Sequence, residues 1–478
     1  MLRTRDRIRH GPFGLCMLVL FGCVDERIVF RDRELFTEPP AGAANFVGYT
    51  DADAKLVVCG NCHVGHQGDW VKTAHADAWK TLEANPGKQA LCEGCHSVSS
   101  RGNFASGQAG YDATKDKRYR DVQCESCHGA SLEHVRAPDR SLPPLASLAV
   151  DTGAAITRGC GECHSGTHHP YAEEWKSSGH GNVQLSPAGR AECNICHTAE
   201  DVLAGWGIRA NYAERDTVTT NASRHLPITC SVCHDPHASD IPGQLRFPVD
   251  VPSEEQNLCM KCHHKRGNPD PSTFRGPHSP EGPVLLGYGG WWPPALQFAG
   301  DTIRAAHGSS QNPKLCAGCH LPRFTVTDAQ GGFQYQATGH LFEAIPCINA
   351  QGLPTRGDCA LGQRSFKTCT EGCHVHTEAS ARSAYVTVQL RITTLANTVD
   401  AMLKQVPASE FSTSDNRYTT GEGARFNMEL GQTAGSFIHN PFLIEALLTG
   451  SIVQLRKDYN IPAPPGIPLE NILSRAEH

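Results

Sequence analysis

A five-residue pattern, Cys-x-x-Cys-His, recurs along this chain and constrains its fold more than any other feature. The 478 residues include 22 Cys and 25 His, and the pattern occurs eight times. The copies are Cys59–His63, Cys92–His96, Cys124–His128, Cys160–His164, Cys193–His197, Cys230–His234, Cys259–His263 and Cys316–His320. A ninth copy, Cys369–His374, has one additional residue between its cysteines. Chance predicts far fewer than one such motif, so the chain must fold around whatever the motifs bind.

The spacing within the motif points to covalently attached haem. Two thiols add across the two vinyl groups of one porphyrin, and the adjacent His becomes an axial ligand of the iron. The sequence therefore predicts nine c-type haems, with one on the looser ninth motif. The predicted attachment residues are Cys59, Cys62, Cys92, Cys95, Cys124, Cys127, Cys160, Cys163, Cys193, Cys196, Cys230, Cys233, Cys259, Cys262, Cys316, Cys319, Cys369 and Cys373. The predicted proximal ligands are His63, His96, His128, His164, His197, His234, His263, His320 and His374.

Other uses of these cysteines fit the pattern less well. Structural zinc would need paired Cys-x-x-Cys units or His at zinc-finger spacing, and a thioredoxin-like site needs only one pair. A disulfide framework gives no reason for a His after every second cysteine. Outside the motifs, Cys16 and Cys23 lie near the N-terminus, and we expect a disulfide between Cys347 and Cys359, with two free thiols as the alternative.

Each iron needs a second axial ligand or keeps an open position. Only Met402 and Met428 are free methionines beyond the N-terminal segment and the motifs, whereas histidines outnumber the irons. We therefore predict mostly bis-His haems of low potential, because Met ligation raises the potential. The predicted distal ligands are His75, His134, His180, His225, His237, His278, His307, His340 and His439. His66, His168, His169, His264 and His376 are weaker candidates, better explained as solvated or secondary histidines.

Three of these distal candidates end a second repeated pattern, aromatic-x-x-Ser/Thr-x-His. The copies are Trp70–His75, Trp175–His180 and Tyr335–His340. We interpret each His as a distal ligand, with the aromatic ring packed on a porphyrin. The alternative is a surface His on a helix. His134 and His237 follow motifs closely, so each should serve a neighbouring haem and link consecutive haems.

The N-terminus is typical of an export signal. Four Arg residues precede an apolar run from Phe13 to Gly22, which is too short to span a bilayer. The run ends at Leu20–Cys23, which resembles a bacterial lipobox and predicts lipidation of Cys23; an ordinary signal peptide or an uncleaved anchor is the alternative. No later apolar stretch is long enough to span a membrane. Acidic residues outnumber basic ones by 49 to 43, which predicts no nucleic-acid partner.

The expected fold class is mainly α with much irregular coil and few strands. Hydrophobic residues make up only 39% of the chain and aromatics 7%, so haems should supply much of the apolar interior. We divide the chain into residues 1–22, a lipoprotein signal; 23–375, the motif-bearing region; and 376–478, a helical region with a Pro-rich tail. One long helix is expected over Ala379–Val406 and a second from Asn440-Pro441 onward. The links Ser97–Gly110, Pro138–Pro144 and Gly267–Pro294 should be irregular.

With these motifs the chain resembles the bacterial multihaem c-type cytochromes. The N-terminal part is similar to the cytochrome c-554 group. The segment Phe437-Ile-His439-Asn440-Pro441 resembles the end of the pentahaem nitrite reductase and hydroxylamine oxidoreductase group. The nitrite reductases of that group use a Cys-x-x-Cys-Lys motif, which this chain lacks, so the resemblance does not extend to that activity.

The resemblance implies electron transfer along closely spaced haems, with redox proteins as donor and acceptor. A lipid on Cys23 would hold the exported protein at a membrane. The outer membrane is favoured because the residue after Cys23 is Val24 and not the Asp that is typical of retention at the inner membrane. An octahaem-type reductase of an oxidised nitrogen or sulfur compound, acting at one open haem, is the alternative. Its catalytic residues are unknown, although Lys261, His264, Lys265 and Arg266 form a basic cluster. A filament of stacked haems is a third and weaker interpretation.

Overall fold

The structure is a computed structural model of the full chain. It describes residues 36–150, 159–182, 187, 190–208, 225–294, 296, 302–370, 373–374, 377–415, 417–462 and 465–466. The chain divides into residues 1–37 and a compact unit, Glu38–His478, to which all of the described helices and strands belong. The export signal, the lipobox Cys23 and most of the Pro-rich tail lie outside the described residues.

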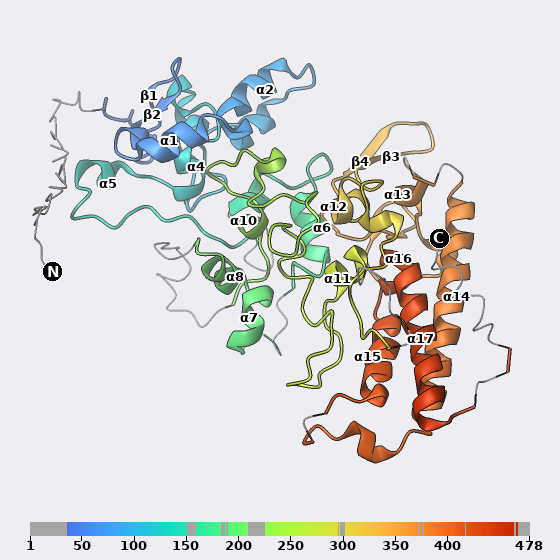
Figure 1. The fold of residues 1–478 in the computed structure, drawn as a ribbon. Coiled ribbons are helices and arrows are strands. Elements are labelled where there is room, and N and C mark those ends of the chain that lie inside the picture. Colours follow the sequence, from blue (N-terminus) through green and yellow to red (C-terminus); the bar gives the residue numbers. More distant parts are fainter. Residues whose placement is uncertain are drawn as a thin grey trace, which may run out of the picture. The chain divides into compact units, whose positions relative to one another are not determined.

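The compact unit is mainly helical, as the sequence predicts (Figure 1). Its first helices, all short, are α1 Val64–Trp70, α2 Ala78–Ala84, α3 Tyr111–Thr114, α4 Cys124–His128, α5 Leu132–Arg136, α6 Tyr171–Ser177, α7 Ala191–His197 and α8 Ala199–Gly205. The later short helices are α10 Cys230–Cys233, α11 Glu281–Leu286, α12 Leu315–His320, α13 Lys367–Thr370 and α16 Ser436–His439. Irregular segments join them, and 3-10 turns over Val58–Asn61, Ala90–Cys95 and Gly159–Glu162 begin three of the motifs.

Strands are few and short. Three antiparallel pairs are present in the described residues: β1 Tyr49–Asp51 with β2 Leu56–Val57, β3 Phe324–Thr327 with β4 Phe333–Ala337, and β5 Cys347–Ile348 with β6 Pro354–Thr355. The predicted disulfide between Cys347 and Cys359 is confirmed, and it ties β5 to the segment that follows β6.

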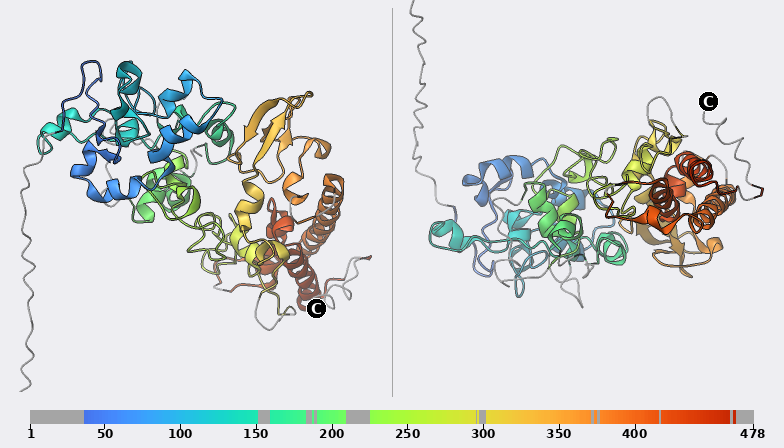
Figure 2. Two further views of the ribbon diagram at one scale, coloured as in Figure 1. Left: turned by 90° about the horizontal axis from the view of Figure 1, so that it is seen from above. Right: turned by 60° about the horizontal axis from the view of Figure 1, so that its bottom comes forward.

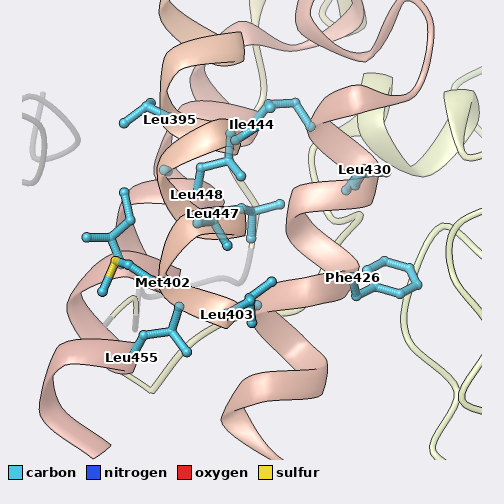
Figure 3. Packing of buried hydrophobic residues seen from close by; sticks show 14 of the residues in the cluster. Leu395, Met402, Leu403, Phe426, Leu430, Ile444, Leu447, Leu448 and Leu455 are labelled. Atoms are coloured by element: carbon cyan, nitrogen blue, oxygen red, sulfur yellow. The ribbon is translucent and has the colours of Figure 1, made fainter. Parts of the chain in front are cut away.

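Three long helices form the largest apolar core of the described residues. They are α14 Glu378–Leu403, α15 Thr420–Gln432 and α17 Pro441–Tyr459, and they lie side by side (Figures 1 and 2). Their buried side chains, including Met402, Leu403, Leu447 and Leu448, gather between the helices in Figure 3, whereas Phe426 points to the other side of α15. No helix among the described residues is long and apolar enough to cross a membrane.

The sequence predicts two of these three helices. The helix expected over Ala379–Val406 is α14, and the one expected from Asn440-Pro441 is α17, with Pro441 in its first turn. Helix α15 was not predicted. Its signal was nevertheless present, because Thr419 and Glu422 form a reciprocal capping box at its start.

Asn440 stabilises the bundle beyond its role as a helix cap. Its Oδ1 accepts from Leu443 N at 3.0 Å, and its buried Nδ2 donates to the carbonyls of Val284 and Ile303. Replacing Asn440 by Ala removes the cap and leaves two buried carbonyls without this donor. We expect Asn440→Ala to lower the free energy of unfolding by about 1–3 kcal/mol, measured by denaturant unfolding followed by far-UV circular dichroism. Exposed Asn85 provides a control whose Ala variant should change stability little.

Candidate functional site

Each Cys-x-x-Cys-His motif forms a tight turn that groups its three reactive side chains. The motifs are numbered in chain order as sites 1–9. In sites 1, 4, 6, 7 and 9 the backbone N–H of the motif His donates to the carbonyl of the first cysteine, for example His164 N to Cys160 O at 2.9 Å and His263 N to Cys259 O at 3.0 Å. In site 2 the N–H of His96 donates to Glu93 O at 3.1 Å instead. One turn therefore presents two thiols and an imidazole together. All eighteen motif cysteines are free of disulfides.

Site 9 reaches the same local closure despite its additional residue. His374 N donates to Cys369 O at 2.9 Å, so the motif His bonds to the first cysteine as it does in site 4. The His374 ring also has a second His ring opposite it, that of His307, at a centroid separation of 6.3 Å. The looser motif is thus arranged like the regular ones.

Seven motif histidines face a second His ring from a different part of the chain at nearly constant separation. The ring centroids lie 6.1–6.3 Å apart in every case. The pairs, with the motif His first, are His128 and His237, His164 and His75, His197 and His278, His234 and His340, His263 and His180, His320 and His439, and His374 and His307.

This separation fits one metal ion held between two imidazoles. Two metal–nitrogen bonds of about 2 Å, each followed by about 1.1 Å from the nitrogen to the ring centre, place the centroids about 6.2 Å apart. Direct ring packing is closer, as His66 and His237 show with a centroid separation of 4.6 Å. The residues present therefore fit a haem iron at each of the seven pairs.

The structure brings seven of the nine predicted distal histidines to a motif His and leaves two apart. His134 on α5 contacts Ser141 through Nδ1 at 3.5 Å. Among the described residues neither His134 nor His225 faces a motif His ring. His237, which follows site 6, pairs with site 3, so it links motifs that are neighbours in space rather than consecutive in sequence.

Sites 1 and 2 differ from the other seven. His63 of site 1 lies 6.3 Å from His66, but the two residues are three apart at the start of α1. Side chains at that spacing share one helix face, so the two rings cannot readily take opposite sides of one iron. His96 of site 2 faces no other His ring within the described residues, although His169 is near enough to interact with it electrostatically.

The aromatic repeat anchors two of the distal histidines. The indole N–H of Trp70 donates to Val122 O at 2.9 Å, and that of Trp175 donates to Ile228 O at 2.7 Å. Each carbonyl lies two residues before a motif. The Ser or Thr of each copy, Thr73 or Ser178, bonds back to the carbonyl of its own Trp. In each copy the pattern thus fixes the segment that carries the His against the second attachment motif that follows it in the chain, site 3 for Trp70 and site 6 for Trp175.

The third copy of the repeat uses a different anchor. It follows strand β4 rather than a helix, and its polar groups converge on the buried carboxylate of Glu174. Tyr335 OH, Thr338 N, Thr338 Oγ1 and His340 N all donate to that carboxylate at 2.7–3.2 Å. Sequence reasoning missed Glu174, because nothing in the chain order relates it to a segment 160 residues later.

Burial keeps four of the paired histidines neutral. It lowers the pKa of His164, His180, His340 and His439 to about 4, with nearby histidines adding to the effect. A neutral imidazole offers a lone pair to a metal, whereas a protonated one does not. These four rings are therefore ready to ligate at neutral pH, whereas the bond to Glu281 raises the pKa of His263.

Sulfur atoms of different motifs lie against one another. Cys pairs in contact are Cys59 with Cys124, Cys95 with Cys163, Cys160 with Cys230, Cys196 with Cys262, and Cys259 with Cys316. These contacts join site 1 to 3, 2 to 4, 4 to 6, 5 to 7, and 7 to 8. Electrostatic interactions relate Cys127 to Cys160, Cys233 to Cys262, and Cys319 to Cys373. These bring sites 3 and 4, 6 and 7, and 8 and 9 together.

The basic cluster after site 7 is engaged in local contacts. The Lys261 ammonium lies 4.0 Å from the centre of the Phe247 ring, and Arg266 donates to Gly276 O at 2.9 Å. His264 bonds through Nδ1 to Met260 O at 2.6 Å. Three of the four basic residues thus have structural roles.

Family models match two parts of the chain. Residues 58–129, which span sites 1–3, match the family of cytochrome c554 and c-prime. Residues 226–268, which span sites 6 and 7, match a doubled CXXCH motif.

Curated relatives match part of the chain. It is 22% identical over 189 residues to the multihaem cytochrome MtrA of Shewanella baltica, a match that covers 37% of this chain and 53% of MtrA. It is 28% identical over 171 residues to the polyhaem cytochrome OmcB of Geobacter sulfurreducens, covering 32% of this chain and 21% of OmcB. The chain thus spans about half of the length of the first relative and about a fifth of the second.

Solved structures share the fold over most of the chain. The outer cell wall cytochrome OcwA superposes with a TM-score of 0.55 at 16% identity, covering 86% of this chain and 100% of OcwA. An undecahaem cytochrome from the S-layer of Carboxydothermus ferrireducens superposes with a TM-score of 0.53 at 17% identity, covering 90% of this chain and 71% of the other chain. The repeated attachment turns, the family matches and this shared fold together place the chain among the bacterial multihaem c-type cytochromes.

Proposed function

We propose that the protein transfers electrons along nine c-type haems, most of them bis-His and of low potential. The observation that supports this most strongly is the set of seven His pairs at 6.1–6.3 Å. An iron with two strong protein ligands exchanges electrons without binding a substrate. The residues of sites 3–9 would serve this chemistry by holding the iron between two imidazoles and by keeping neighbouring porphyrins close.

The contacts between motif sulfurs suggest the order of electron flow. Each sulfur joins a porphyrin edge, so sulfurs in contact place two porphyrin edges together. The contacts between sites 1 and 3, 4 and 6, and 7 and 8, together with the electrostatic interactions between sites 3 and 4, 6 and 7, and 8 and 9, support a trunk through sites 1, 3, 4, 6, 7, 8 and 9. Site 2 branches from site 4, and site 5 branches from site 7. Electrons would enter and leave through exposed haem edges, which redox proteins can approach.

We also propose that the chain is exported, lipid-anchored through Cys23 and held at the outer membrane. The lipobox-like Leu20–Cys23 supports the anchor. The solved relatives are described as an outer cell wall cytochrome and an S-layer cytochrome, which agrees with an exterior location. Mass spectrometry of the purified protein should find a mature N-terminus at a lipidated Cys23. An unlipidated terminus elsewhere would contradict the anchor.

The electron-transfer proposal is tested by haem count and spin state. Pyridine haemochrome analysis of the purified holoprotein should give nine haems per chain. Ferric low-temperature EPR should show low-spin iron at sites 3–9. The angle between the two ring planes governs the signal shape, so sites 7 and 9, with angles of 75° and 76°, should give large-gmax signals. Site 6, at 21°, should give a rhombic signal. High-spin iron at most sites would overturn the proposal.

A second candidate function, a reductase of an oxidised nitrogen or sulfur compound, is favoured by site 2, and site 1 likewise lacks a His ring on the opposite side of its motif His in the described residues. His96 is held through Nδ1 to Ala78 O at 2.7 Å and lacks a facing His in the described part of the chain. An open iron there could bind a small ligand. We expect a high-spin ferric signal that cyanide or nitrite converts to low spin. If His169 closes over the iron instead, only His169→Ala should produce that signal.

A further inference from the structure

One motif histidine bonds to a carboxylate rather than to a carbonyl. His263 of site 7 lies with its Nδ1 3.2 Å from Glu281 Oε2. Four other motif histidines use their Nδ1 to bond to neutral backbone oxygens at 2.6–2.9 Å, namely His96, His128, His234 and His320. On the distal side, Asp235 Oδ1 is 3.7 Å from His237 Nδ1, which is too long for a hydrogen bond.

The fold holds Glu281 in this position. Glu281 is the first residue of α11, and the next backbone N–H, that of Gly282, donates to His263 O at 2.8 Å. A side chain at position 282 would meet that oxygen at 2.9 Å, so glycine permits the close approach. Leu285 and Leu286 of α11 pack with Met260 of the motif. The start of α11 is therefore attached to His263 by one side-chain bond from Glu281 and one backbone bond from Gly282.

A carboxylate on the outer nitrogen changes the ligand. It accepts the Nδ1 proton, makes the imidazole more basic and adds negative charge beside the iron. Both effects stabilise ferric over ferrous iron, because the ferric form carries the greater positive charge. A carbonyl at the same position orients the ring with much less charge. We propose that Glu281 holds the site 7 haem at a lower potential than a carbonyl would, as a tuning residue that acts through His263.

Site 7 is where such tuning matters most. Its Cys262 contacts Cys196 of site 5, its Cys259 contacts Cys316 of site 8, and Cys262 also interacts with Cys233 of site 6. Three routes therefore meet at one haem. A low-potential haem at such a junction passes electrons to its neighbours rather than storing them, so Glu281 would govern how charge divides between site 5 and sites 8 and 9.

This inference rests on the proposed bis-His ligation of site 7 by His263 and His180. The test is a potentiometric titration of the full holoprotein followed by EPR. Sites 7 and 9 have nearly perpendicular rings, so two large-gmax signals are expected in the parent protein. In Glu281→Gln, which keeps the shape and a hydrogen-bond acceptor but removes the charge, the midpoint of one signal should move upward. The site 9 signal should stay in place.

Two further variants separate charge at His263 from other effects. Glu255→Gln removes the same charge from an exposed position four residues before Cys259, and it should leave both midpoints unchanged. Glu281→Asp keeps the charge but places the carboxylate farther from His263. The midpoint potential should therefore shift less in Glu281→Asp than in Glu281→Gln. Two large-gmax signals with unmoved midpoints in Glu281→Gln would overturn the role of Glu281 and leave bis-His ligation standing. High-spin iron at site 7 in the parent protein would instead overturn the ligation itself.

Discussion

A variant that cannot attach the site 6 haem is expected to stop conducting electrons between the N-terminal and C-terminal parts of the protein. Cys230→Ala combined with Cys233→Ala removes both thioether bonds of that haem. We expect the conductance measured across the molecule to fall by at least an order of magnitude. The haem count should fall by one.

The reason lies in the position of site 6 in the set of sulfur contacts. Cys230 contacts Cys160 of site 4, and Cys233 interacts with Cys262 of site 7. Sites 1–4 and sites 5, 7, 8 and 9 are thereby connected through one haem. Electron tunnelling falls exponentially with the distance between porphyrin edges. Removing this haem replaces two short steps by one long step, so the long step limits the whole path.

The measurement uses single molecules held between two gold contacts by introduced thiols. Val64→Cys lies beside site 1 and is 68% exposed, and Ser380→Cys is exposed six residues after His374 of site 9. The motif cysteines would be consumed by haem attachment, Cys347 is bonded to Cys359, and in the proposed mature protein Cys16 is removed with the signal and the Cys23 thiol carries the lipid, so the two new thiols alone bind gold. Both anchors are placed in the parent protein and in each haem-deletion variant.

The matched control removes a haem from a branch instead of the trunk. Cys193→Ala with Cys196→Ala deletes the site 5 haem and should leave the conductance within a factor of two of the parent value. Circular dichroism of each variant checks that the α14–α17 bundle is intact. Equal losses in the two variants would show that conduction depends on haem number or folding, and the trunk through site 6 would then be wrong.

The chemistry of this protein was more predictable from sequence than its geometry. The attachment motifs are local, because two cysteines and a histidine within one turn define the site. The distal ligands are set by tertiary structure, yet seven of the nine predicted histidines do face a motif His, since few other residues could serve. The two that the structure leaves apart, His134 and His225, have no sequence property that distinguishes them from His237 or His278.

The fold was predictable where helices signal their own ends. Pro407 follows the end of α14, and Asn440-Pro441 begins α17, so local rules sufficed for both. The order in which sites approach one another was not predictable. The ring that faces His128 of site 3 comes from beyond site 6, and the ring that faces His164 of site 4, that of His75, comes from before site 2. Such exchanges depend on how irregular links fold back, and no periodic pattern encodes that.

Glu174 is the residue whose loss should most damage a single haem site without touching a ligand. Its carboxylate is buried on α6 and accepts four hydrogen bonds from the loop that carries His340. In Glu174→Ala the donor groups of Tyr335, Thr338 and His340 lose their hydrogen-bond acceptor in a buried environment. Each buried group left unpaired costs about 1–3 kcal/mol, and relaxation of the loop recovers part of the sum. We expect a loss of about 3 kcal/mol in the free energy of unfolding, measured by denaturant titration.

The spectroscopic consequence is more specific than the loss of stability. Gly339 beside His340 has a positive φ and approaches the backbone of Leu321, so the loop has one position in which His340 meets His234. Once Glu174 is gone, this loop should leave that position and free one axial site of the site 6 iron. Site 3, with a ring angle of 25°, also gives a rhombic signal, so low-temperature EPR should then show the rhombic intensity fall by one haem and one high-spin iron appear, with the large-gmax signals retained.

The adjacent Glu173 provides the control for Glu174. It accepts a hydrogen bond from Gly166 N at 2.8 Å but has no bond to the His340 loop. Glu173→Ala should keep site 6 low-spin and cost less stability. If Glu174→Ala unfolds the chain, Glu174→Gln retains the acceptor shape and should give a mixture of low-spin and high-spin iron at site 6. A fully low-spin Glu174→Ala protein would mean that haem ligation itself fixes His340, with the carboxylate contributing only to folding.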